Sequence, residues 1–227
     1  MDQEKTLTEV ALSYGWRKTK SNFGFFAMFL IAIGVVQVFF LGLTGLLAWK
    51  AWYVAPIPLL IDAVLAIFMG TAALSLSLKV NHDEKLRFTE LWVGGSKAVN
   101  FVIGSILYGI IVFVGSLLLI IPGIYLAIKY QFFAVCILEK DVSAVEGLKM
   151  SGRITKGSWG DCFWLVVEQG IACFLGMLAL GIGLFWAVPT VLVAHGYAYR
   201  SISGELAPVT EAAQPMAGAV PVPVPTE

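Results

Sequence analysis

The chain has 227 residues, of which 59% are hydrophobic and 13% charged, and its 15 lysines and arginines balance 15 aspartates and glutamates. Soluble domains carry about 25% charged residues, so this chain has too little charge to cover a water-facing surface. The zero net charge argues against nucleic acid as a partner, and the 3 cysteines and 2 histidines show no metal-ligand or disulfide spacing.

Long apolar stretches dominate the sequence. Segments 23–49 and 98–121 each run for more than twenty residues without a charge, which is enough to cross a bilayer core of about 30 Å. Segment 1–22 is polar and amphipathic, and the apolar run after it is too long for a signal-peptide core, so we expect no cleaved signal. These features predict an all-α integral membrane protein whose first partner is the lipid bilayer.

Six apolar segments are predicted to be transmembrane helices, at 23–48, 54–78, 98–121, 123–138, 162–180 and 182–200. Three connections between them are short, at 49–53, Pro122-Gly123 and 181–183, whereas 79–97 and 139–161 are long and polar. One helix over 98–138 would be about 60 Å long. Proline disfavours helix at the residue before it and glycine readily adopts a turn, so Pro122-Gly123 predicts a turn. We therefore expect three helical hairpins.

The basic residues predict the orientation of these hairpins. All lysines and arginines except Lys50 and Lys129 lie in the polar segments or at the start of the tail. The positive-inside rule then places both termini and both long loops in the cytoplasm. In this arrangement Trp16 lies at an inner helix end and Trp186 at an outer one, both at the headgroup level that tryptophan prefers.

The chain contains an imperfect internal repeat. The segments LSYGWRKTKSNFG (12–24) and LKMSGRITKGSWG (148–160) share an arginine, a threonine and a lysine in register, and Phe23 aligns with Trp159. Each copy follows a capping-box pattern that marks the start of a helix, at 6–9 and at 143–146. A weaker middle unit keeps only the span and turn spacing. We predict that a cytoplasmic interfacial helix precedes each hairpin.

Two groups of residues are candidates for function. Basic residues beside aromatic ones suit anionic lipid headgroups, at about 1 kcal/mol for each cation near the surface; these are Arg17, Lys18, Lys20, Arg153 and Lys156. The same charges also serve to orient the chain, and both interpretations stay open. Ionisable residues within the spans are costly in lipid and should face the protein interior or water; these are Asp62, Lys129, Glu168 and His195.

Similar depth in the membrane predicts two pairings among the interior residues. Glu168 and His195 lie about 10 and 8 Å from the cytoplasmic ends of neighbouring spans at the helical rise. Asp62 and Lys129 both lie roughly 9–12 Å from the outer ends of theirs. A lysine there could instead extend its charge toward the interface, and Glu168 and His195 could each have separate partners.

The chain divides into three parts. Residues 1–22 form a cytoplasmic amphipathic segment, residues 23–202 the six-helix transmembrane domain, and residues 203–227 a cytoplasmic tail rich in alanine, valine and proline. Such a tail has little to pack, and we expect it to be a disordered spacer.

Four stretches together resemble known families: FTELWVGG (88–95), LLLIIPGIYLAIKYQFF (117–133), SAVEGLKMSGRITKGSW (143–159) and LALGIGLFWAVPTVLVAHGYAYRSI (178–202). The chain resembles uncharacterised bacterial six-span membrane families related to the membrane domain attached to glycerophosphoryl diester phosphodiesterases, which include the YciC-like proteins. This resemblance implies a six-span fold in the bacterial cytoplasmic (inner) membrane. Nothing in the chain matches the soluble phosphodiesterase barrel, so that activity is not expected.

The sequence favours a role without catalysis. It shows no serine, histidine and carboxylate cluster, no His-Glu-x-x-His motif and no phosphate-binding glycine loop, so we expect neither an enzyme nor a cofactor. One hypothesis is a membrane component that binds lipid or an unidentified protein partner in the bacterial envelope. The other is a small-solute or lipid transporter; a hydrated cavity that joins Asp62, Glu168 and His195 would favour it.

Overall fold

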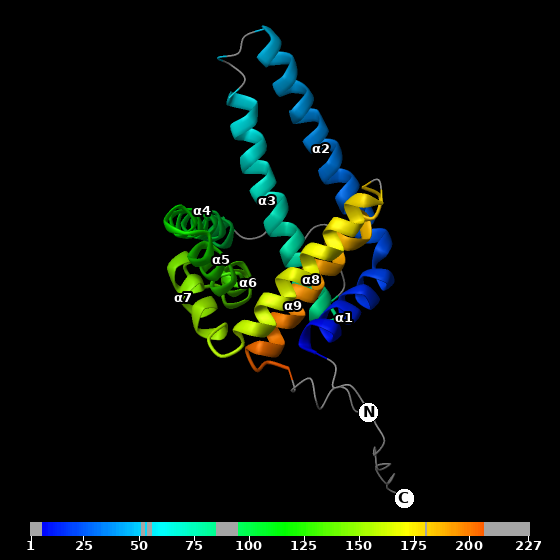
Figure 1. Cartoon of the computed structure of the whole chain (residues 1–227). Coiled ribbons are helices and arrows are strands. Elements are labelled where there is room, and N and C mark those ends of the chain that lie inside the picture. The colour runs from blue at the N-terminus through cyan, green and yellow to red at the C-terminus, as the bar shows by residue number, and fades with distance from the viewer. Residues whose placement is uncertain (1–5, 51–52, 54–55, 85–94, 180, 207–227) are drawn as a thin grey trace, which may run out of the picture.

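The computed structural model describes residues 6–50, 53, 56–84, 95–179 and 181–206, and these residues form helices and no strands. The helices are α1 (Leu7–Ser21), α2 (Phe23–Lys50), α3 (Pro56–Asn81), α4 (Gly95–Leu118), α5 (Ile120–Lys129), α6 (Phe133–Lys140), α7 (Ala144–Ile154), α8 (Trp159–Leu178) and α9 (Leu184–Ile202) (Figure 1). The prediction of an all-α protein is confirmed. The predicted tail from residue 207 lies outside the described residues.

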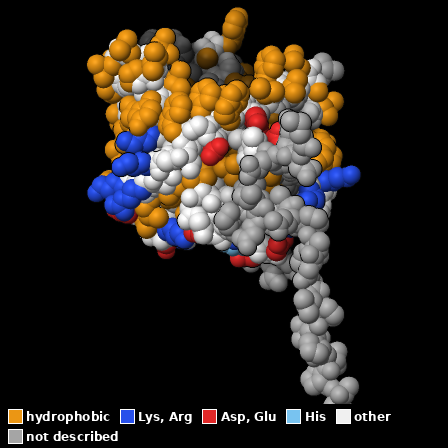
Figure 2. All heavy atoms as spheres, turned by 60° about the horizontal axis from the view of Figure 1, so that its bottom comes forward, with side chains coloured by type: hydrophobic (Ala, Val, Ile, Leu, Met, Phe, Trp, Pro, Cys, Tyr) orange, Lys and Arg blue, Asp and Glu red, His pale blue; other side chains and the backbone are white. Residues whose placement is uncertain are grey.

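Five helical segments are long and apolar enough to cross a membrane: Phe23–Trp49, Pro56–Asn81, Gly95–Leu118, Ile120–Lys140 and Trp159–Leu178. Their apolar side chains are largely exposed, as Val38 (71%) on α2 and Leu117 (77%) on α4 illustrate. Figure 2 shows these side chains covering one part of the surface, with lysines and arginines gathered below its border. Helices that face lipid have this composition, because lipid covers apolar side chains that water would not.

The sixth predicted span, 182–200, forms α9, which differs from the other five segments. It is not among the segments that are apolar enough to cross a membrane by length and composition. Instead it is well enclosed, and Val193, Ala194, Ala198 and Tyr199 are 0% exposed. Helices α1, α3 and α8 cover it. A helix with such neighbours does not need an apolar surface on every side.

The predicted turn at Pro122-Gly123 is misplaced. Helix α4 ends at Leu118, and Leu119 is extended, with φ −163° and ψ 146°. Pro122 lies in the first turn of α5, where the missing N–H of proline removes no helical hydrogen bond. Gly123 instead allows close packing of α5 on α4, because a Cβ there would lie 2.1 Å from Ser116 Oγ.

The predicted fourth span, 123–138, is interrupted. Helix α5 ends at Lys129 and α6 begins at Phe133, with turns between them. The segment is therefore two short helices in place of one.

Two of the three helices predicted to precede the hairpins are present, and both start as the capping pattern predicts. Thr6 Oγ1 accepts a hydrogen bond from Glu9 N, and Ser143 Oγ accepts one from Glu146 N, both at 3.4 Å. Each of them packs on another helix, α1 on α9 and α7 on α6. The corresponding segment of the middle unit, 85–94, lies outside the described residues.

Small residues bring these two helices close to their neighbours. Helix α1 lies across α9 at Gly15, where a Cβ would lie 2.4 Å from the Thr190 carbonyl oxygen. Helix α7 packs on α6 at Gly147, where a Cβ would lie 2.6 Å from Ile137 Cγ1. Only glycine permits backbones to approach so closely.

The assignment of Trp16 and Trp186 to opposite membrane faces is wrong. Their ring centroids lie 5.3 Å apart, and Phe23 stacks on Trp186 with a centroid distance of 3.9 Å. The start of α2 therefore meets the connection between α8 and α9. Figure 1 shows α8 and α9 running obliquely to the α2 and α3 pair. Because α1 crosses α9, it brings together two helix ends that the sequence placed on opposite sides.

Charged residues join the ends of α1, α3, α6 and α9. Ion pairs link Lys18 to Asp83 and Lys140 to Glu205. His82 Nε2 lies 2.8 Å from Glu139 Oε1, and Arg200 Nη1 donates to the Asn81 carbonyl at 2.6 Å. The hydrogen bond from Lys18 lowers the pKa of Asp83. These ends all belong to segments that the basic residues predicted to share one side of the membrane.

Candidate functional site

The break between α5 and α6 is held by hydroxyl groups of α7. Ser151 Oγ donates to the Lys129 carbonyl oxygen at 3.2 Å, and Thr155 Oγ1 donates to the same oxygen at 3.1 Å. Phe132 N donates to Ser151 Oγ at 3.1 Å. Backbone groups freed by a helix break inside an apolar protein need such partners. Helix α7 therefore supplies the groups that make the break possible.

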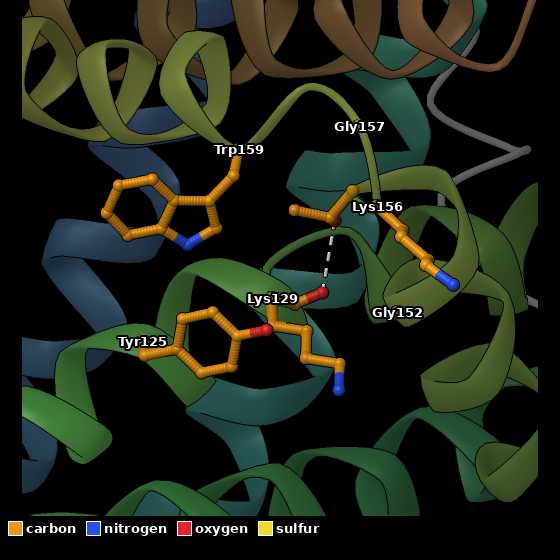
Figure 3. A pocket seen from close by; sticks show the side chains of 7 residues that line it. Tyr125, Lys129, Gly152, Lys156, Gly157 and Trp159 are labelled. Carbon is orange, nitrogen blue, oxygen red and sulfur yellow. Dashed lines mark hydrogen bonds between the residues drawn. The ribbon is translucent and has the colours of Figure 1, made fainter.

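A cavity of about 350 Å³ opens beside this break. It is lined by Tyr125, Lys129, Gly152, Thr155, Lys156, Gly157 and Trp159. Figure 3 shows the rings of Tyr125 and Trp159 on one side of it and the Lys129 and Lys156 side chains on the other. The lining comes from α5, the end of α7, the loop after it and the first residue of α8.

The cavity carries two positive charges and no lining carboxylate. Neither Lys129 nor Lys156 forms an ion pair within the described part of the chain, whereas several other cations pair with carboxylates: Lys18, Lys97, Lys140, Arg153 and Arg200. Lys129 is half-buried and Lys156 is exposed, and two lysines beside one cavity without a lining carboxylate create a positive potential that attracts an anion.

Aromatic rings flank the two charges. The rings of Tyr125 and Trp159 lie 6.3 Å apart and are stacked, and Trp159 stacks on Phe163 at 5.6 Å. Lys129 Nζ lies 5.9 Å from the Tyr125 ring centroid and 5.4 Å from that of Tyr130, within range of a cation–π interaction. Lysine, tyrosine and tryptophan at one level are typical of contacts with lipid headgroups.

The first copy of the repeat has different contacts at the positions that correspond to the cavity lining. Phe23, which aligns with Trp159, stacks directly on Trp186. Gly15 aligns with Ser151, and it contacts the uninterrupted helix α9 instead of a helix break. Lys20, the counterpart of Lys156, is exposed as Lys156 is, but it does not line the cavity. The two copies therefore share a local fold, and the cavity described above lies at the second copy, beside two lysines.

The residues predicted to contact lipid differ in whether they line the cavity. Lys156 lines the cavity. The others do not: Arg153 lies 3.8 Å from Glu146, Lys18 pairs with Asp83, and Arg17 lies 5.8 Å from the Tyr14 ring centroid.

The predicted interior pairs do not form among the described residues. Gln37, with its amide oriented toward α3, donates to both carboxylate oxygens of Asp62 at 3.2 Å. Lys129 lies instead in the cavity.

Glu168 and His195 have separate partners. Glu168 Oε1 accepts a hydrogen bond from Thr8 Oγ1 at 2.9 Å. His195 Nδ1 lies 3.5 Å from Gln169 Nε2, and its ring packs against Phe132. The interior polar residues are therefore distributed over several contacts and do not share one cavity.

Sequence reasoning missed the roles of Tyr125, Gly152 and Gly157. The repeat could have pointed to Trp159 and Thr155, whose counterparts occupy equivalent helix ends. No motif marks the convergence of Lys129 with Lys156, because the segment 130–132 between the two helices contains neither proline nor glycine. Among the described residues, no group of histidine, cysteine or carboxylate side chains could hold a metal ion.

Comparison with known proteins finds mycobacterial relatives, among them two uncharacterised proteins. The chain is 28% identical over 105 residues to the uncharacterised protein Rv2560 of Mycobacterium tuberculosis, a match that covers 46% of this chain and 32% of that protein. It is 28% identical over 103 residues to the uncharacterised protein Mb2590 of Mycobacterium bovis, covering 45% and 31%. The matched region is thus about a third of the length of these curated relatives. No family model and no solved structure matches the chain.

Proposed function

We propose that this chain is a non-enzymatic membrane protein that binds an anionic lipid headgroup in the cavity beside the α5–α6 break. The observation that carries this proposal is the pair of lysines, Lys129 and Lys156, which line one cavity without a carboxylate partner. A bound anion would supply the missing negative charge. Lysine is a common ligand of phosphate groups, acting as a point charge.

The surroundings of the cavity favour a lipid as the source of that anion. On α5, the apolar side chains of Ile121 and Ile124 are 79% and 49% exposed, and on α8 Trp164 is 58% exposed. A headgroup in the cavity would thus have apolar surface beside it for its acyl chains. Anionic lipid is also the chemistry that basic residues near a membrane surface attract.

The composition of the cavity lining favours binding over catalysis. Its lining contains no histidine, carboxylate or cysteine that could act as a general base or a nucleophile. The threonine in the lining, Thr155, already donates to the Lys129 and Ser151 carbonyl oxygens.

The proposal includes an orientation in the membrane. We place the chain in the bacterial cytoplasmic membrane, with the charged ends of α1, α3, α6 and α9 facing the cytoplasm. The support is the concentration of lysine and arginine in the segments that form those ends.

Transport is the second candidate, and the interrupted α5–α6 segment favours it. Broken helices often line the substrate site of transporters. Against this, Asp62, Glu168 and His195 do not join the cavity. Release of labelled lipid or solute from liposomes that contain the protein would support transport over binding alone.

The test of lipid binding is native mass spectrometry of the protein released from membranes that contain anionic and zwitterionic lipids. We expect anionic lipid to remain bound to the wild type and to be lost from the Lys129→Gln/Lys156→Gln variant. The matched control is Lys20→Gln/Lys149→Gln, which removes the same charge from exposed residues outside the cavity. Equal loss from both double variants would contradict a site in the cavity.

A further inference from the structure

We infer that the cavity selects a lipid headgroup that carries two negative charges, rather than any anionic lipid. This inference rests on the proposed function and names its ligand class. The chemistry required is a phosphate monoester, as in phosphatidate, or two phosphates in one headgroup.

The charge balance of the cavity carries the inference. Lys129 and Lys156 reach the same space from two different elements, and neither has a carboxylate partner among the described residues. A headgroup with one negative charge would leave one ammonium group in contact with solvent alone, whereas a headgroup with two negative charges can interact with both lysines. A zwitterionic headgroup would bring a cation of its own toward two cations, which is unfavourable at close range.

The hydroxyl and the aromatic groups of the cavity do not change this balance. Thr155 Oγ1 already donates to two backbone carbonyl oxygens, so its proton is committed. Tyr125 and Trp159 supply ring surfaces and neutral donors. The two lysines are thus the only charged groups in the lining within the described part of the chain.

The pH dependence of binding separates a dianion from a monoanion. The second proton of a phosphate monoester leaves with a pKa of about 6, so phosphatidate gains its second charge as pH rises from about 5.5 to about 8. Phosphatidylglycerol carries a single charge over the same range. The titratable groups that line the cavity are Tyr125, Lys129 and Lys156. A change in the protonation of the protein itself would alter the affinity for both lipids. The ratio of the two affinities therefore isolates the effect of the lipid charge.

The experiment is a titration of the detergent-purified protein with three short-chain lipids that share the same acyl groups: phosphatidate, phosphatidylglycerol and phosphatidylcholine. Each charge-assisted contact contributes enough that we expect phosphatidate to bind about tenfold more tightly than phosphatidylglycerol at about pH 8. The preference should narrow at about pH 5.5, where the phosphate is largely a monoanion. Phosphatidylcholine should bind more weakly than either.

Variants identify the cavity as the source of the preference. The Lys129→Gln/Lys156→Gln variant should lose the preference for phosphatidate over phosphatidylglycerol. The control variant Lys20→Gln/Lys149→Gln should keep this preference. Lys129→Arg/Lys156→Arg keeps both charges and should retain the preference, so it provides a result even if the glutamine variant does not fold.

Each adverse outcome has a distinct meaning. Equal, lysine-dependent binding of phosphatidate and phosphatidylglycerol at about pH 8 would overturn the inference and leave the proposed function standing. Lipid binding that is unaffected in Lys129→Gln/Lys156→Gln would overturn both. Inorganic phosphate serves as a lipid-free probe; if it binds with the same lysine dependence and displaces phosphatidate, the ligand is a soluble phosphate and the lipid assignment fails.

Discussion

The contrast between Thr155 and Thr19 shows how one residue type has different roles in the two copies of the repeat. Both side chains are almost fully buried, at 2% and 0% exposed. Thr155 Oγ1 donates to the Lys129 carbonyl oxygen, whereas Thr19 Oγ1 has no hydrogen-bond partner among the described residues. The shared threonine in the sequence therefore marks a common position and not a common interaction.

This contrast gives a prediction with an internal control. Ser151→Ala/Thr155→Val should lower the free energy of unfolding by about 3 kcal/mol, because it leaves the Lys129 carbonyl and the Phe132 N–H buried without partners. Thr19→Val should cause no loss, since it removes a hydroxyl that has no partner. Thermal unfolding in detergent, with the two variants side by side, measures the difference. Equal destabilisation would mean that the hydroxyls do not hold the break.

A double-mutant cycle tests the separation of Asp62 from Lys129. Gln37 is the neighbour of Asp62, and tyrosine rings are the neighbours of Lys129. We therefore expect the effects of Asp62→Asn and Lys129→Met on folded yield to add, with a coupling energy close to zero. A clear coupling would restore the ion pair that the sequence suggested.

Depth along a helix was the basis for the predicted pairs, and it proved insufficient. Depth gives the position of a residue along the helix. Contact also requires that the two side chains face each other, and depth does not specify the direction in which a side chain points. Because α5 ends at Lys129, that residue lies beside α7. Nothing local in the sequence marks the break at 130–132.

At the scale of helices, the crossing of α1 and α9 depends on Gly15. In Gly15→Ala the new Cβ would lie 2.4 Å from the Thr190 carbonyl oxygen, which belongs to the backbone and cannot move aside cheaply. We expect destabilisation of about 2 kcal/mol, the usual range for overpacking.

The control for this substitution is Gly24→Ala. No heavy atom lies within 4 Å of a Cβ at Gly24, and alanine favours helix over glycine. This variant should unfold at the same temperature as the wild type or slightly higher. If both alanine variants behave alike, close packing of α1 on α9 is not what holds α1 in place.

The existence of the helices was largely predictable, because apolar length and capping residues act locally. Thr6 and Ser143 mark the starts of α1 and α7 as the capping pattern indicated. The misplaced turn had a physical cause: Pro122 is tolerated in the first turn of α5, so its position marks a helix start rather than the connection. Leu119, the residue with an extended backbone, lies among other apolar residues, so nothing in its side chain marks it as the connection.

For the whole molecule, cysteine labelling in intact cells tests the orientation. In a background without the native cysteines, Tyr53→Cys, at a residue between α2 and α3 that is 71% exposed, should react with a membrane-impermeant thiol reagent from outside. Lys149→Cys on α7 should react only after the cells are permeabilised. The reverse pattern would invert the proposed topology.

The gathering of charged helix ends was predictable from charge alone, whereas the angles between helices were not. Basic residues at those ends follow a rule that needs no knowledge of packing. The contact between Phe23 and Trp186 depends on how α1 crosses α9, which small residues such as Gly15 and Ala194 determine. Such contacts join segments far apart in the sequence, and a single sequence does not specify them.

The packing of α1 on α9 has a consequence for biosynthesis. The ribosome makes α1 well before α9, so the face of α1 that includes Ala11 and Gly15 has no partner while the intervening helices are inserted. Helix α1 can therefore pack on α9 only after α9 has been synthesised, so this step comes late in folding. A nascent chain stalled before α9 should expose α1 to protease, and one released after α9 should protect it.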